Sequence, residues 1–317
     1  MQQRAELVWL PGAVVQMVLQ GHIELTRSPD SDDDCGMVTL SPRVLAAGFV
    51  FLEGPRWHDG RLWASDMHDD RVVTVDMDGR VETVATLTQP SGLGWLPDGR
   101  LLIVSMIDRT LRCLDRSGLS NYADVSALAA FHLNDMVVDG AGRAYVGNFG
   151  YDYEAGAAPV PAMLAMVGAD GVVAPAATDL SFPNGMVITP DGRTLIVAET
   201  FAHRLTAFDR AADGTLSRRR EWAALGDLFP DGICLDAAQG VWVASPISNE
   251  VIRVLEGGEI TARVPVAQHA IACALGGPER RVLFICTAPA IARHAARARR
   301  GGRLEVVNVP VAGAGWP

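Results

Sequence analysis

The sequence repeats a pattern of short strands and turns, and this repeat limits the fold more than any other feature. Residues 182–209 read FPNGMVITPDGRTLIVAETFAHRLTAFD. The apolar runs at 186–188, 195–198 and 205–208 are too short for helices, and the first two are joined by Pro-Asp-Gly at 190–192, a sequence typical of tight turns. Runs of this length and spacing predict three antiparallel strands.

Five further copies of the pattern occur along the chain. They begin at Leu52, Gln89, His132, Phe229 and His269. Copies spaced roughly 38 to 50 residues apart have the length of β-propeller blades. The sequence therefore predicts an all-β fold, a six-bladed β-propeller.

The segments between copies provide a fourth, outer strand, as at residues 81–87, 172–176 and 260–264. The sixth copy has no such segment after it. Residues 43–49 (RVLAAGF), which precede the first copy, are the natural donor. We therefore expect an N-terminal strand to complete the last blade, because this closes the ring and leaves no free sheet edge.

The first 42 residues do not fit the repeat. We interpret residues 1–42 as an N-terminal extension, expected to be mobile, and residues 43–317 as the propeller and catalytic domain. The apolar stretch at 7–19 is interrupted by polar residues and too short to cross a membrane, and no signal-peptide cleavage site follows it.

Composition narrows the partners and the compartment. A net charge of −10 and a pI near 5.1 argue against nucleic acid, and nothing predicts a membrane partner. The five cysteines are odd in number, and four lie in or beside apolar strand runs, which is typical of buried, reduced thiols. We therefore expect a cytoplasmic protein, either a monomer or a homodimer.

One position in each copy stands immediately before the innermost strand, so six side chains should meet near the axis at one mouth of the ring. These positions hold Glu53, Ser91, Asn134, Asn184, Asp231 and, in the sixth copy, Ala270 or Ile271. Asn or Asp before Gly also marks turns, and this alternative explains any single position. It does not explain Glu53, or four oxygen-bearing side chains at one axis.

A bound cation would explain this group, because charged side chains at a buried axis are costly without a partner. Glu53, Asn134, Asn184 and Asp231 offer two carboxylates and two amide carbonyls, without Cys or His. This donor set favours one hard divalent ion, Ca²⁺ first, with Mg²⁺ or Mn²⁺ behind it. Zn²⁺ usually takes nitrogen or sulfur ligands, although an oxygen site does not exclude it.

The motifs around these positions resemble the SMP-30/gluconolactonase/LRE family of six-bladed propellers. They are LEGP at 52–55, LND at 133–135, FPNG at 182–185 and FPDGICLD at 229–236. The resemblance extends over most of the repeat region. It implies an enzyme that hydrolyses lactones, and relatives with the same metal arrangement hydrolyse organophosphates.

Residue by residue, the resemblance implies that Glu53, Asn184 and Asp231 hold the metal, with Asn134 at or beside it. The chain departs from the family pattern in the third blade. Sugar-lactone members resemble Arg-x-Asn-Asp there, whereas this chain has His132 in place of the Arg. Because that Arg is expected to hold sugar hydroxyls, its absence favours a less polar lactone.

The loops between the second and third strands of each blade should lie on the same face as these side chains. The long loop at 148–161 carries Phe149, Tyr151 and Tyr153, and it suits a lid over an apolar or aromatic ligand. The alternative is a surface loop whose aromatic rings pack on their neighbours. We interpret Asn148, Phe149 and Tyr151 as substrate contacts.

Four histidines are expected on this face: His68, His132, His203 and His269. The last three are further candidate substrate contacts. His132, two residues from Asn134, is also a candidate catalytic residue. Residues 288–302 (APAIARHAARARRGG) predict a short basic helix, which could attract anionic substrates or remain a solvated face.

These observations predict a metal-dependent hydrolase of carboxylic esters that opens a lactone ring. The cation would polarise the carbonyl, and Asp231 would take a proton from water. Two alternatives stay open. One is an enzyme resembling strictosidine synthase, which joins an amine to an aldehyde without a metal. The other is a non-catalytic binding propeller whose metal is structural.

Overall fold

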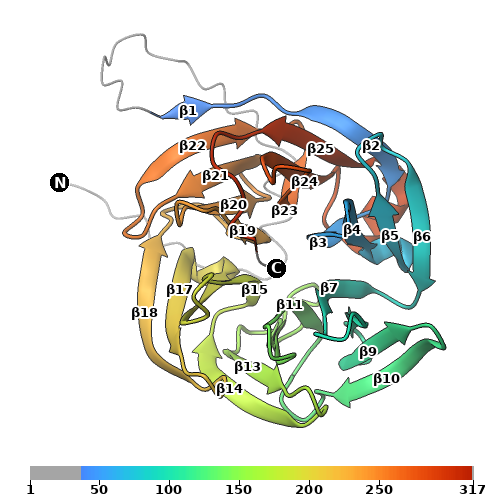
Figure 1. Ribbon diagram of the computed structural model, residues 1–317, viewed down its shortest axis with the longest axis vertical. Helices are drawn as coiled ribbons and strands as arrows, with labels where there is room; N and C mark the ends of the chain where they lie inside the picture. Colours follow the sequence, from blue (N-terminus) through green and yellow to red (C-terminus); the bar gives the residue numbers. More distant parts are fainter. Residues whose placement is uncertain (1–36, 316–317) are drawn as a thin grey trace.

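The structure is a computed structural model that describes residues 37–315. Its strands form six small sheets arranged in a ring (Figure 1). This arrangement confirms the six-bladed β-propeller expected from the repeat. The first strand of each blade borders the centre of the ring, called the hub below, and the fourth strand lies at the rim.

Each blade contains four strands that pair antiparallel from the hub outward. Blades 1 to 3 consist of β3 (Leu52–His58), β4 (Arg61–Asp66), β5 (Arg71–Val75) and β6 (Val81–Thr86); β7 (Pro90–Trp95), β8 (Leu101–Ser105), β9 (Thr110–Asp115) and β10 (Gly118–Asp124); and β11 (Leu133–Val138), β12 (Ala144–Asn148), β13 (Ala162–Val167) and β14 (Val173–Leu180).

Blades 4 to 6 follow the same plan. They consist of β15 (Pro183–Ile188), β16 (Thr194–Glu199), β17 (Arg204–Arg210) and β18 (Leu216–Ala224); β19 (Ile233–Leu235), β20 (Val241–Ser245), β21 (Glu250–Val254) and β22 (Ile260–Pro265); and β23 (His269–Gly276), β24 (Val282–Ala288), β25 (Gly302–Asn308) and β2 (Arg43–Phe49). Within residues 37–315, the short helices η1 (Met67–Asp69), η2 (Thr200–Ala202) and α2 (Arg293–Arg299) lie in loops.

The ring closes through the N-terminal strand, as predicted. β2 pairs antiparallel with β25, with Arg43 opposite Val306 and Phe49 opposite Gly302. One addition was not predicted: β1 (Val38–Thr39) pairs parallel with β22 and gives the fifth blade a fifth strand. The proposed extension therefore contributes to the sheet at its end, and its residues 1–36 lie outside the described part.

Apolar side chains of the strands pack between neighbouring blades. Blades 3 and 4, for example, bury Val137 and Tyr145 against Met186 and Leu195. Similar clusters fill the other interfaces of the ring, so each blade is stabilised by two neighbours. Among residues 37–315, no helix has the length and apolarity needed to cross a membrane.

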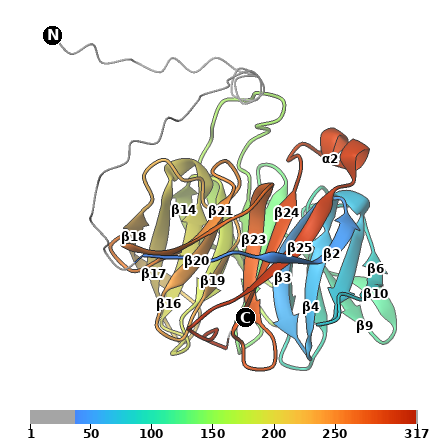
Figure 2. The same cartoon turned by 90° about the horizontal axis from the view of Figure 1, so that it is seen from above.

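Strand pairing fixes which loops lie beside the start of the innermost strands. In blade 1, Glu53 of β3 pairs with Ser65 near the end of β4, so the loop after β4 lies at the same end. We call this end of the ring the mouth face. The loop after β12 and helix α2 both rise from this face (Figure 2).

Candidate metal and substrate site

The innermost strands are irregular at the predicted positions. Pairing with the second strand shifts between Glu53 and Arg56 in blade 1 and between Pro183 and Met186 in blade 4. Comparable shifts occur in blades 2, 3 and 6. A bulge bends the strand and changes the direction of its side chains. Proline favours such irregularity because it has no N–H for the ladder.

The glycines after these positions do not form turns; they allow neighbouring blades to come close. A Cβ on Gly185 would lie 2.5 Å from the backbone nitrogen of Ile233, and one on Gly232 would lie 2.4 Å from Cβ of Ala272. Real side chains cannot approach so closely. The turn interpretation of Asn184-Gly185 is therefore wrong, since both residues lie within β15.

Contacts between blades join the four predicted oxygen donors. Asn134 Nδ2 donates to the carbonyl of Pro183 at 3.2 Å, next to Asn184. The backbone N–H of Gly185 donates to the carbonyl of Asp231 at 3.2 Å. The carboxylates of Glu53 and Asp231 interact across the hub. These contacts link the segments that carry Glu53, Asn134, Asn184 and Asp231 at the hub, and the role of the four side chains as metal ligands stays a prediction.

The hub brings buried carboxyl groups together with little positive charge to balance their ionised forms. Burial raises the pKa of the Glu53 carboxyl well above its usual range, and the Asp231 charge adds to this effect. Burial likewise raises the pKa of Asp231; a hydrogen bond from the Asn184 side chain opposes this effect, and the Asp135 charge adds to it. The Arg56 charge lowers the pKa of Glu53, and Arg56 forms a buried ion pair with Asp135 at 2.8 Å. If Glu53, Asp135 and Asp231 are all ionised, their three negative charges and the one positive charge of Arg56 leave a net charge that one divalent cation would neutralise.

The hub also holds polar atoms without a hydrogen-bond partner. Of seven such buried side-chain atoms in residues 37–315, three belong to predicted hub positions: Ser91 Oγ, Asn184 Oδ1 and Asp231 Oδ1. An unpaired buried group costs about 1–3 kcal/mol. Oxygen atoms of this kind, beside unbalanced carboxylates, fit a hard divalent cation.

The donor set is mixed, and this distinguishes it from an all-acidic or histidine-rich centre. Across the described chain, no three His, Cys, Asp or Glu side chains are grouped as a metal centre. The predicted set contains two carboxylates, and its other two donors are amides. Any metal at the hub would therefore depend on Asn134 and Asn184 as well as on the acids.

Comparison with known proteins identifies the family. The family model for the SMP-30/gluconolactonase/LRE-like region matches residues 51–289, which is most of the chain. The chain belongs to this family. Regucalcin from Danio rerio is 27% identical over 179 residues, which cover 55% of this chain and 60% of that protein. The match thus spans less than two thirds of the relative.

Solved structures agree with the fold. A calcium-binding protein, regucalcin, from Agrobacterium tumefaciens is 23% identical, with a TM-score of 0.75 over 89% of this chain and 98% of that one. A gluconolactonase from Xanthomonas campestris is 24% identical, with a TM-score of 0.68 over 84% and 89%. Family membership supports a gluconolactonase- or regucalcin-type propeller for this chain.

The residues predicted as substrate contacts differ in how many contacts they already make within the protein. His132 is half-buried and stacks on Phe131 with ring centroids 4.0 Å apart, and burial lowers its pKa. Both amide atoms of Asn148 are hydrogen-bonded to the backbone: Nδ2 donates to the carbonyl of Met163, and Oδ1 accepts from the N–H of Gly150. Their substrate roles stay predictions.

The other two histidines predicted as substrate contacts hold neighbouring loops. His203 Nδ1 donates to the carbonyl of Leu228 at 2.9 Å, and His269 Nδ1 donates to that of Pro246 at 2.8 Å. Both contacts use Nδ1, so Nε2 is the ring nitrogen that the predicted substrate contact would use in each of these histidines.

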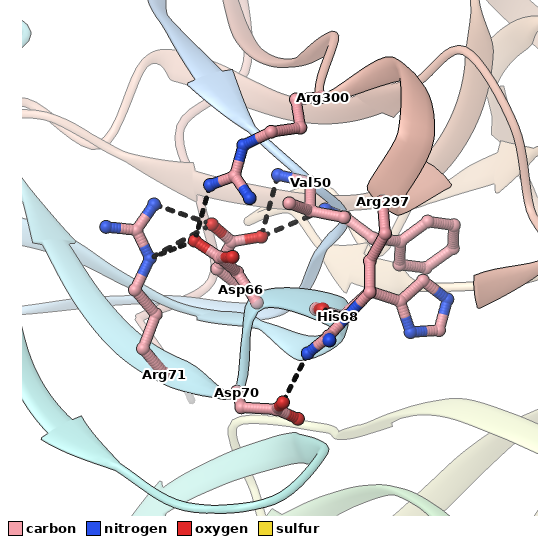
Figure 3. Close-up of polar contacts among 9 residues, drawn as sticks. Val50, Asp66, His68, Asp70, Arg71, Arg297 and Arg300 are labelled. Atoms are coloured by element: carbon pink, nitrogen blue, oxygen red, sulfur yellow. Dashed lines mark hydrogen bonds and ion pairs between the residues drawn. The ribbon is translucent and has the colours of Figure 1, made fainter. Parts of the chain in front are cut away.

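The basic insertion forms the expected helix, α2, but three arginines in and after it bind blade 1. Arg297 pairs with Asp70 (Figure 3). Arg293 also pairs with Asp70, and Arg300 pairs with Asp69. Arg297 Nε also donates to the backbone carbonyl of His68 at 2.6 Å. These contacts tie the last blade to the first across the mouth face and leave less charge available for an anionic substrate.

Aromatic residues that the sequence analysis did not single out adjoin the hub. Phe182 lies two residues before Asn184, and Phe229 lies two residues before Asp231. Phe201 connects them, with ring centroids 4.8 Å from Phe182 and 6.4 Å from Phe229. Their signal was present in the repeat, because the position two residues before the hub position is aromatic in several blades.

Proposed function

We propose that this chain is a metal-dependent hydrolase that opens the ring of a lactone less polar than a sugar lactone. The observation that carries the proposal is the set of partnerless oxygens beside excess carboxylate at the hub. His132 occupies the position of the Arg in the Arg-x-Asn-Asp pattern of sugar-lactone relatives. The absence of that Arg supports the choice of a less polar substrate. We further propose that the protein is cytoplasmic and acts on a small molecule as a monomer or homodimer.

Glu53, Asn134, Asn184 and Asp231 would hold one divalent cation, with Ca²⁺ first and Zn²⁺, Mn²⁺ or Mg²⁺ as alternatives. Once bound, the cation supplies a Lewis acid that stabilises negative charge on the carbonyl oxygen of the ester. The hydrogen bond from Asn184 Nδ2 to Thr200 Oγ1 (3.3 Å) orients the amide and leaves its Oδ1 for this purpose.

Asp231 is the proposed general base. It takes a proton from the attacking water, and its Oδ1 has no competing hydrogen bond in the structure. His132 is the second candidate, because burial keeps its imidazole neutral and able to accept a proton near pH 7.

The test is a hydrolysis screen of δ-valerolactone, gluconolactone, phenyl acetate and a phosphotriester with Ca²⁺, Mn²⁺ or Zn²⁺. Turnover is expected with an added metal and should stop with a chelator. Asp231→Asn should lose most turnover, whereas Asp191→Asn, in an exposed outer turn, should keep it. Turnover that survives the chelator would favour the metal-independent alternative, and none with any metal would favour a binding propeller.

A further inference from the structure

An aromatic residue lies two positions before the hub residue in four blades. The pairs are Phe51 and Glu53, His132 and Asn134, Phe182 and Asn184, and Phe229 and Asp231. Each of these aromatic residues lies just before the innermost strand of its blade begins, at the mouth face. The aromatic rings therefore lie at the mouth-side ends of the innermost strands, beside the oxygen donors.

Loops on the mouth face fill the spaces between these rings. Phe149 stacks on Phe182, with centroids 4.4 Å apart, and lies 6.1 Å from His132. Tyr153 approaches Phe149 at 5.6 Å and meets Phe182 edge-on at 5.4 Å. With Phe201 between Phe182 and Phe229, the rings form one continuous surface over blades 3 to 5, called the aromatic wall below.

The wall adjoins the oxygen donors directly. Thr200, next to Phe201, accepts a hydrogen bond from Asn184 Nδ2 and donates one to the carbonyl of Pro230 at 2.8 Å. The hydroxyl of Tyr153 lies within the electrostatic reach of the Asp231 carboxylate. A ligand bound at the oxygen donors would therefore meet the wall on the side of blades 4 and 5.

Two further features set these rings apart from ordinary core residues. Tyr145 and Trp242, in the core, are almost wholly buried, whereas Phe149, Phe201 and Phe229 are half-buried, and Phe182 between them is 7% exposed. Phe182 has a φ of 56°, in the left-handed region that a non-glycine residue rarely adopts. Backbone strain of this kind clusters at ligand sites.

We propose that the aromatic wall binds the aromatic ring of a lactone fused to an aromatic group, while the ester reaches the oxygen donors. This inference rests on the proposed function and narrows its substrate. A flat apolar ring stacks on Phe and Tyr rings, and each such contact changes affinity about three- to tenfold. A sugar ring would need hydrogen bonds, and both amide atoms of Asn148 are already hydrogen-bonded to the backbone of Met163 and Gly150.

The test uses two ketones that cannot be hydrolysed. 2-Tetralone has a benzene ring fused to its six-membered ring, and cyclohexanone has the six-membered ring alone. Ligand-observed NMR measures the Kd of each for the full chain. We expect tighter binding of 2-tetralone, and Phe182→Leu and Phe201→Leu should each reduce this preference about three- to tenfold, since leucine keeps apolar bulk without the ring.

Trp95→Leu is the matched control, because Trp95 is a half-buried aromatic residue that stacks on His58, at the end of the innermost strand remote from the mouth face. It should leave the preference unchanged. If Phe182→Leu does not fold, the half-buried Phe201 still gives the result. An unchanged preference in Phe201→Leu, or equal binding of both ketones by the original chain, would overturn the proposal.

The same preparations separate this inference from the proposed function. Hydrolysis of isochroman-3-one and δ-valerolactone, which match the two ketones in shape, is measured in parallel. Preferential binding of 2-tetralone through the wall without lactone turnover would support the wall and refute the hydrolase. Turnover of both lactones with no effect of either Leu variant on the ketone preference would refute the wall and keep the hydrolase.

Discussion

Replacing Asn184 by leucine should change stability in opposite directions with and without a metal ion. Asn184 is 5% exposed, and its Oδ1 has no hydrogen-bond partner. In metal-free protein this orphaned oxygen costs about 1–3 kcal/mol, whereas the long hydrogen bond to Thr200 contributes about 1 kcal/mol. Asn184→Leu should therefore be neutral or stabilising by up to about 2 kcal/mol in EDTA.

With Ca²⁺ present the sign should reverse. At a free Ca²⁺ concentration 100 times its Kd, binding stabilises the folded protein by about 2.7 kcal/mol. A variant that lacks one of four ligands loses most of this stabilisation, so it should become the less stable protein. Urea unfolding in EDTA and in CaCl₂ measures both differences, with the midpoint and slope compared in each condition.

Asn148→Leu provides the matched control. Asn148 is also buried, but both of its amide atoms are hydrogen-bonded. This variant should be destabilised equally in EDTA and in CaCl₂. If Asn184→Leu is instead destabilised by the same amount in both conditions, its oxygen takes no part in metal binding and the proposed site is wrong.

Three further changes test separate parts of the structure. Asp231→Asn should lower kcat for the best lactone about 10²- to 10⁴-fold without a change in fold, as checked by circular dichroism. Burial lowers the pKa of His68 to about 4, so stability present above pH 6.5 should be lost as the pH falls toward 4, by at most about 3 kcal/mol. His68→Gln should flatten this dependence in urea midpoints. Gly185→Ala should destabilise by about 1–3 kcal/mol because its Cβ meets the next blade, whereas Gly140→Ala, with open space around it, should stay within about 0.5 kcal/mol.

Each of these predictions has a contrary result. Full activity of Asp231→Asn would reject this residue as the base. Equal pH dependence of His68→Gln and the original chain would show that other groups cause the acid sensitivity. Equal stability of the two alanine variants would mean that the blades can separate at Gly185 without cost.

The repeat was enough to predict the ring and its closure. Residues 43–49 were assigned as the closing strand because the sixth copy lacked an outer segment, and β2 occupies these residues. β1 escaped prediction because a pair of residues has no periodicity to read. Its pairing with β22 depends on where the chain passes, which is a tertiary effect.

The hub residues were predictable for a related reason. Side chains at the same place in successive blades must converge on one axis, so Glu53, Asn184 and Asp231 could be placed together by comparing copies. The roles of Asn148 and the arginines of α2 could not be read in this way. Their partners, such as Asp70 for Arg293, lie in other copies or in loops of unique sequence.

The most direct test of the central claim is a crystal structure of the full chain with bound Ca²⁺, with an anomalous difference map measured at long wavelength. One peak is expected at the hub, about 2.3–2.6 Å from side-chain oxygens of Glu53, Asn184 and Asp231, with Asn134 at or beside it. A hub without a peak while Ca²⁺ saturates the protein elsewhere would contradict the claim that these blades converge to hold a cation.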